Sequence, residues 1–129
     1  MNLEAIAGWL QTKNCGTVGE SLFVTEMPED CREGTLLIGN YRGTPIDHYM
    51  PGYYVAVFRT IIRGEDYESA KALANRVKSA LNSHAGYELP GLSVKQCLVM
   101  NLPRVYRKSV GGFWEFEFDS EIVFIDEIA

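Results

Sequence analysis

Three cysteines and two histidines are the residues of this chain best suited to nucleophilic or metal chemistry. Cys15, Cys31 and Cys97 are widely separated, with no CxxC pair and no histidine at ligand spacing. A structural zinc site needs about four ligands grouped in short paired segments. We therefore predict no metal site, and thiols that stay reduced and are incidental to function.

Catalytic motifs are equally scarce. The chain has no Walker phosphate loop and no GxGxxG, GxSxG or HExxH motif. Cys31, His48 and Asp47 could supply a Cys–His–Asp set, but nothing in their spacing selects it, because catalytic sets are defined in space. We predict that the chain is not an enzyme and that His48 is an exposed loop residue.

The charge is distributed unevenly along the 129 residues. The 12 Lys and Arg residues against 17 Asp and Glu give a net charge of −5. Nine of the basic residues lie between Arg59 and Lys108, whereas the segment from Gly112 onward holds six acidic residues and no basic one. A net-acidic chain is not expected to hold nucleic acid by its backbone. The asymmetry permits head-to-tail contact between copies.

The segment 113–125 alternates between apolar and acidic residues, which predicts a long half-buried strand. Its apolar face carries Trp114, Phe116, Phe118, Ile122 and Phe124, and its other face carries Glu115, Glu117, Asp119 and Glu121. Asp119–Ser120 is the point at which a break or bulge in this strand would fall.

Two helices are predicted to pack on the strands. Apolar residues spaced i, i+3, i+4, i+7 after Asn2 predict a short helix over residues 2–13. An alanine-rich apolar stripe after Asp66, a capping residue, predicts a second helix over residues 66–82. Segment 83–91 ends this helix.

The remaining segments predict strands and loops. Strands are expected at residues 21–26, 35–40, 53–63 and 94–102, a loop at 41–52 and a basic connector at 104–108. In the strand 53–63, the face with Tyr54, Ala56, Phe58, Thr60 and Ile62 is the one that we expect a helix to cover. The whole chain, 1–129, is predicted to be a single α+β domain. In it, a mostly antiparallel sheet has a helix packed across one face and a short N-terminal helix.

Neither a membrane nor a secretory pathway is indicated. No apolar run approaches the ~18–20 residues that a membrane span needs. The amino-terminal segment has no basic n-region and carries Glu4 and Gly8 within its apolar stretch. We expect a protein that starts its life in the cytoplasm.

Residues 43–81 carry a more specific pattern. An irregular GTPID loop is followed by a strand that ends in an Arg-Gly step and then by a helix that begins DYESAKALA. This run resembles the central segment of small proteins from tailed bacteriophages, the minor capsid or tail terminator (head-to-tail joining) proteins. The resemblance extends closely over about forty residues and loosely over the α+β order of the chain.

The resemblance implies a structural protein of the virion, located in the tail at the head–tail junction and assembled in the host cytoplasm, with no catalytic activity and no cofactor. Such proteins form a homo-hexameric ring on the last ring of the tail tube protein and dock to the head connector or completion protein. DNA passes through the channel without specific binding. The alternatives are another ring of the head–tail junction, such as a head-completion or adaptor protein, or a small cytosolic α+β enzyme or ligand-binding domain.

Under this resemblance, the acidic row Glu115, Glu117, Asp119 and Glu121 is expected to line the channel or lie close to it, where negative charge would keep DNA from adhering. Two alternatives are a solvated sheet face and cross-strand pairing with Arg59 and Arg63.

The loop at 41–53 is the second candidate surface, because Tyr, Met and Arg are enriched at interface cores. The residues that we expect at a subunit or partner interface are Tyr41, Arg42, Ile46, Tyr49, Met50 and Tyr53, with Arg104 and Arg107 of the basic connector. The alternatives are a loop folded over its own core and a solvated basic turn.

Overall fold

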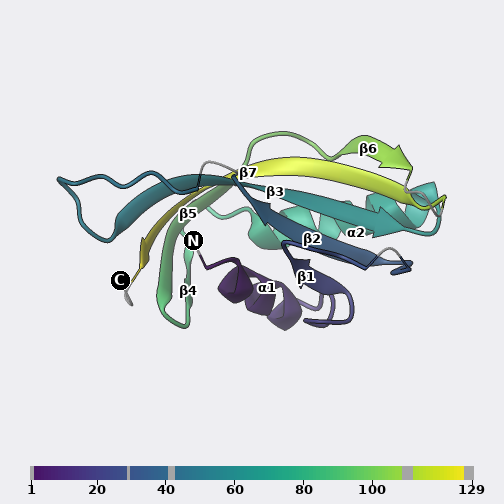
Figure 1. Cartoon of the computed structure of the whole chain (residues 1–129), viewed down its shortest axis with the longest axis horizontal. Helices are drawn as coiled ribbons and strands as arrows, with labels where there is room; N and C mark the ends of the chain where they lie inside the picture. Colours follow the sequence, from purple (N-terminus) through teal and green to yellow (C-terminus); the bar gives the residue numbers. More distant parts are fainter. Residues whose placement is uncertain (1, 29, 41–42, 109–111, 127–129) are drawn as a thin grey trace.

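One long curved sheet organises the molecule, and both helices lie on the same side of it (Figure 1). The computed structural model describes residues 2–28, 30–40, 43–108 and 112–126. Along the chain these form α1 (Leu3–Thr12), β1 (Leu22–Val24), β2 (Gly34–Gly39), β3 (Tyr53–Gly64), α2 (Tyr67–Leu81), β4 (Tyr87–Leu89), β5 (Leu92–Val99), β6 (Arg104–Lys108) and β7 (Trp114–Asp126).

Strands β3 and β7 form the long central pair of the sheet. These two strands run antiparallel in unbroken register, from Tyr53 opposite Ile125 to Gly64 opposite Trp114. Within the described residues the strand order is β1-β2-β3-β7-β5-β4, with β6 also paired to β7, and β1–β2 is the one parallel pair. The prediction of an α+β fold with a mostly antiparallel sheet is therefore confirmed.

The main core lies between this sheet and the helices. Phe58 and Ile62 of β3 and Phe118 of β7 are almost completely buried there, together with Leu73 and Val77 of α2. The expected alternation along β3 is thus confirmed, because its even-numbered face is the one that the helices cover.

Small residues allow α2 to lie close to the end of β3. Ala70 and Ala74 are fully buried, and a Cβ added to Gly64 would lie 2.7 Å from the backbone nitrogen of Ala70. The first turn of α2 is capped as expected, since the Asp66 carboxylate accepts a 2.7 Å hydrogen bond from the backbone N–H of Ser69.

Two sequence-based predictions for the strands are wrong. The segment 104–108 is not a connector but strand β6, whereas segment 83–91 follows the end of α2 as expected and also contains the short strand β4. In addition, β7 has no break or bulge at Asp119–Ser120, since its register with β3 is continuous there. The irregularities lie instead in β5, between Val94 and Gln96, and in β6, between Val105 and Arg107.

The length of β7 explains these differences. Its first half pairs with β6 and its second half with β5, which ends at Val99 rather than at residue 102. Two short strands must therefore pair along one long twisted strand, and a bulge in each of them adjusts its register to the twist of β7.

Candidate functional site

The sheet face opposite the helices, here called the helix-free face, carries the odd-numbered residues of β3 and β7. Because the two strands are in register, Arg59 lies opposite Asp119 and Arg63 lies opposite Glu115. β6 brings Arg104 opposite Glu117 on the same strand. The acidic row expected from the sequence is therefore one continuous row, but it lies among arginines.

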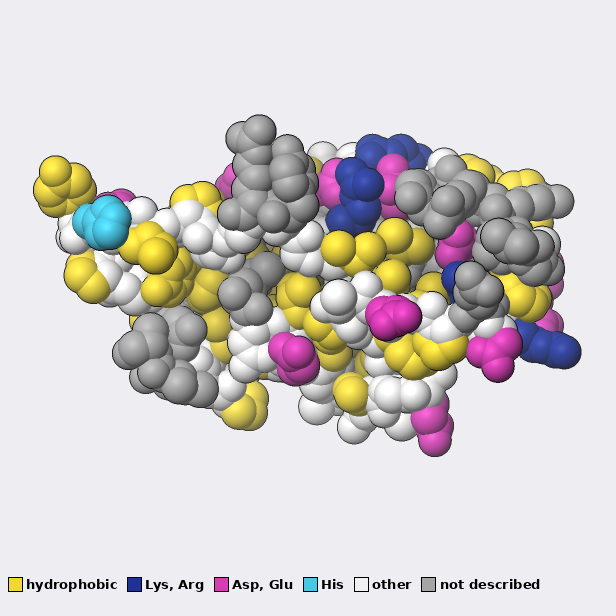
Figure 2. Space-filling model, in the orientation of Figure 1, with side chains coloured by type: hydrophobic (Ala, Val, Ile, Leu, Met, Phe, Trp, Pro, Cys, Tyr) yellow, Lys and Arg dark blue, Asp and Glu magenta, His cyan; other side chains and the backbone are white. Residues whose placement is uncertain are grey.

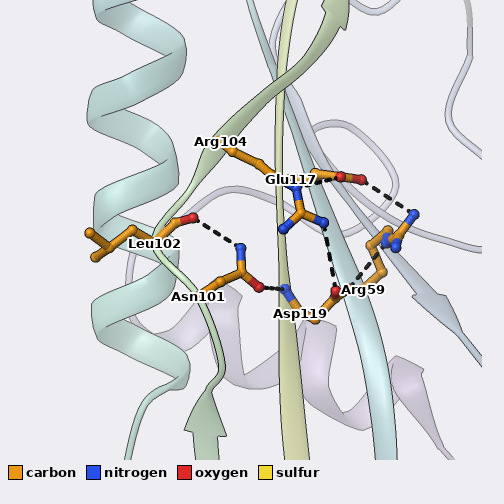
Figure 3. Close-up of polar contacts among 6 residues, drawn as sticks. All are labelled: Arg59, Asn101, Leu102, Arg104, Glu117 and Asp119. Carbon is orange, nitrogen blue, oxygen red and sulfur yellow. Dashed lines mark hydrogen bonds and ion pairs between the residues drawn. The ribbon is translucent and has the colours of Figure 1, made fainter.

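Two carboxylates and two arginines form a closed network in the middle of this face (Figure 3). Glu117 accepts a 2.8 Å hydrogen bond from Arg104 Nε, and its other oxygen lies 3.3 Å from Arg59 Nη1. Asp119 lies 3.1 Å from Arg59 Nε and 3.8 Å from Arg104 Nη2. Each carboxylate is thus bridged by both guanidinium groups, and this occupies the two arginines with partners in their own chain.

A more deeply buried pair lies at the end of the row. The Arg63 and Glu115 side chains are only 9% and 5% exposed, with Arg63 Nη2 3.1 Å from Glu115 Oε2. Arg63 Nη1 also donates to the carbonyl oxygens of Pro28 and Cys31, at 2.8 and 3.0 Å. The pair therefore fixes the connector between β1 and β2 onto the sheet, where Met27 packs with Leu36 and Ile61 in a second small core.

These contacts confirm the alternative that Arg59 and Arg63 pair across strands with the acidic row. Glu121 differs from the other members, because it is half-buried opposite Val57 and Leu98. No ion pair to Glu121 occurs among the residues that the structure describes. Whether the row lies at a channel stays a prediction.

The loop between β2 and β3 forms a projection at one end of the molecule (Figure 1). Ile46, Tyr49 and Met50 are 66%, 95% and 49% exposed, and Tyr53 is half-buried where β3 begins. The loop therefore does not fold over its own core, and the alternative that it would is wrong. Figure 2 shows hydrophobic side chains at the tip of this projection, at the left of the view.

Other predicted interface residues lie elsewhere or cannot be placed. Tyr41 and Arg42 lie outside the described residues. Arg104 is half-exposed within the network around Glu117. The backbone of Arg107 lies in β6 opposite Glu115, and its side chain is outside the described part.

A second exposed apolar cluster was not predicted from the sequence. Met100, Leu102 and Val105 are 58%, 75% and 47% exposed, at the end of β5, in the following connector and at the start of β6. The prediction of a strand over 94–102 placed the first two in a sheet. Asn101 and Pro103, which favour loops, were the signal that could have found this connector.

The candidate nucleophiles do not form a site. Cys31 lies beside the end of β3, and His48 and Asp47 lie in the loop before its start, which separates them by about 30 Å of strand. Burial raises the pKa of the Cys97 thiol to about 11 and also raises that of Cys15. In the described part of the chain, no group of His, Cys, Asp or Glu side chains is arranged to hold a metal ion.

Comparison with known proteins identifies the family. The model of the family described as bacteriophage tail terminator protein matches residues 9–124. The chain belongs to this family. It is therefore a structural component of a phage tail, and the resemblance noted at residues 43–81 is confirmed and extends over most of the chain.

A solved structure supports the fold of this tail terminator family member. A chain from the structure "Virion of native gene transfer agent (GTA) particle" matches with a TM-score of 0.63 at 14% identity, over 95% of this chain and 96% of that chain. Among curated proteins, none matches the chain. In the described residues, no helix is long and apolar enough to cross a membrane.

Proposed function

We propose that this tail terminator protein forms a homo-hexameric ring that caps the tail tube and joins it to the head connector or completion protein. The ring replaces the self-complementary end of the tube with a surface that fits the head, and it leaves a channel for DNA. The work is steric and electrostatic, and it uses neither catalysis nor a cofactor.

The observation that carries the proposal is the exposed apolar loop of a chain in this family. Tyr49 is 95% exposed on a projection whose described residues, 43–52, contribute no side chain to the buried core. A surface that exposes Tyr, Met and Ile together is unfavourable in water, and such a surface is typical of an interaction site. Ile46, Tyr49, Met50 and Tyr53 are therefore proposed to contact a neighbouring subunit or the tail tube.

The helix-free face is proposed to lie at or near the channel. Among the described side chains, the acidic row of Glu115, Glu117, Asp119 and Glu121 is paired with three arginines, Arg59, Arg63 and Arg104, so it holds one more charge than its described partners. Because Arg59 and Arg104 are already bridged by carboxylates, they are not available to hold phosphates. The row would therefore let DNA pass by occupying the arginines rather than by strong repulsion.

Native mass spectrometry of the purified chain, alone and with its tail tubes, tests the proposal. We expect a closed species of six times the 14.5 kDa chain mass, either free or bound at tube ends. A chain that stays monomeric alone and leaves tube ends unoccupied would contradict it.

A further inference from the structure

The exposed apolar side chains of this protein gather in two separate places. Nine large hydrophobic side chains are exposed among the described residues. Four lie on the loop and the adjoining start of β3, namely Ile46, Tyr49, Met50 and Val55, and three lie near the β5–β6 connector, namely Met100, Leu102 and Val105.

The two places lie on different parts of the fold. The loop Gly43–Gly52 projects from the end of the sheet (Figure 1). The connector instead borders a hollow of about 540 Å³ against the end of α2, lined by residues that include Lys78, Val99, Met100 and Leu102. One chain therefore carries both a projecting loop and, at a separate place, an open hollow.

We infer that the loop Gly43–Gly52 of one copy inserts into the hollow between α2 and the β5–β6 connector of the next copy. This inference rests on the proposed ring. A ring built from head-to-tail contacts needs two different surfaces on each chain, one to give and one to receive. The two apolar clusters supply such a pair.

The chemistry of the two surfaces is complementary. Tyr49 and Met50 at the loop tip belong to residue types that are enriched in interface cores, and they would meet the apolar side chains of Met100 and Leu102. Asp47 on the loop and Lys78 in the hollow carry opposite charges, and no ion pair to Lys78 occurs within the described part of the chain. These charges favour one orientation of the contact.

Hydrogen bonds within the loop form turns at its tip. The Asp47 carboxylate accepts a 2.9 Å hydrogen bond from the backbone N–H of Tyr49, and the Asp47 carbonyl accepts one of 3.2 Å from Met50. The backbone N–H of Tyr53 then donates to the Met50 carbonyl at 3.1 Å. Two successive turns thus reduce the entropy that the loop would lose on binding.

The receiving surface is also preformed. Asn101 accepts a 3.1 Å hydrogen bond from the Asp119 backbone N–H and donates one of 2.9 Å to the Leu102 carbonyl, as Figure 3 shows. Met100 N–H donates to the Asp119 carbonyl at 2.8 Å, and Asn82 accepts from Val99 N–H at 3.0 Å. The connector is therefore tied to both β7 and α2, with Leu102 left 75% exposed.

Mixing two assembly-defective variants tests the inference, under the conditions in which the wild-type chain forms rings. Tyr49→Ser removes the loop anchor and Leu102→Ser removes the wall of the hollow. Each variant alone should need a concentration about tenfold or more higher for half of its chains to assemble. In an equal mixture, a Tyr49→Ser chain still offers an intact hollow to the intact loop of a Leu102→Ser chain. We therefore expect native mass spectrometry to show heterodimers in the mixture, at concentrations at which neither variant alone forms dimers.

Val18→Ser is the matched control, because Val18 is 50% exposed and lies outside both clusters. Its rings should assemble as those of the wild type do, and the unfolding midpoints of all three variants should match the wild type. Rings of unchanged stability from either single variant, or a mixture without heterodimers, would overturn the inference and leave the proposed ring in place. A wild-type chain that never forms a ring would overturn both.

Discussion

The buried pair of Arg63 and Glu115 gives the sharpest test of how this sheet is held together. Glu115→Gln keeps the shape of the side chain but removes the negative charge beside a guanidinium whose side chain is only 9% exposed. Removing one partner of a buried pair costs about 3–5 kcal/mol, because the remaining charge stays desolvated. The free energy of unfolding of a chain this long is about 6–19 kcal/mol, so the loss is a large part of it.

Glu65→Gln is the control for this variant. Glu65 lies 3.3 Å from Arg32, but the two side chains are 55% and 75% exposed, and an exposed pair of this kind is worth about 0–1 kcal/mol. Urea unfolding followed by tryptophan fluorescence measures both variants, with the slope against denaturant expected to be unchanged. Thermal midpoints should fall by roughly 10–20 °C for Glu115→Gln and by no more than about 5 °C for Glu65→Gln. Equal losses in the two variants would refute the reasoning.

Three further predictions follow from the described contacts. The double variant Glu117→Gln with Asp119→Asn releases two arginines from their carboxylates, so its affinity for duplex DNA, measured by fluorescence anisotropy, should increase. The slope of log affinity against log salt concentration should also become steeper, by up to about two. An unchanged affinity would argue against the masking of these arginines. Gly64→Ala should lower the free energy of unfolding by about 1–3 kcal/mol, because the added Cβ would lie 2.7 Å from the backbone nitrogen of Ala70. Gly8→Ala in α1 is the control, because its Cβ would have no atom within 4 Å. It should raise the free energy of unfolding by about 0.5–1 kcal/mol in the same chemical unfolding assay. Burial raises the pKa of the Cys97 thiol from 9.0 to about 11, so above pH 9 the unfolded chain loses this proton more readily than the folded chain. The free energy of unfolding should therefore fall as the pH rises above about 9, by about 2 kcal/mol at pH 11. A Cys97→Ala variant should lose that part of the pH dependence.

The sequence predicted the elements whose pattern is local. The helix α2 follows from its apolar stripe and its Asp66 cap, and strand β3 from its alternation and its density of β-branched and aromatic residues. Strand β6 could not be predicted in the same way. Its basic residues look like a turn until they lie opposite Glu115 and Glu117 of β7, which is a contact between distant parts of the chain.

The candidate surfaces show the same limit. Alternation placed four of the acidic residues of β7, Glu115, Glu117, Asp119 and Glu121, on one face, and pairing with Arg59 and Arg63 was among the alternatives. The share of Arg104 in that network depends on the return of the chain after β5, which sequence spacing does not reveal. The hollow beside Leu102 was missed for the same reason, since it is formed by α2 and a connector twenty residues further along the chain.

The capping of the tail tube is the central claim, and the lengths of growing tubes test it most directly. Electron microscopy of tube protein polymerising with and without this chain measures the distribution of lengths and the occupancy of the ends. We predict that the chain halts growth when present at about one hexamer per tube, with a ring at one end of each tube. Tubes that grow to the same lengths with bare ends would contradict the account.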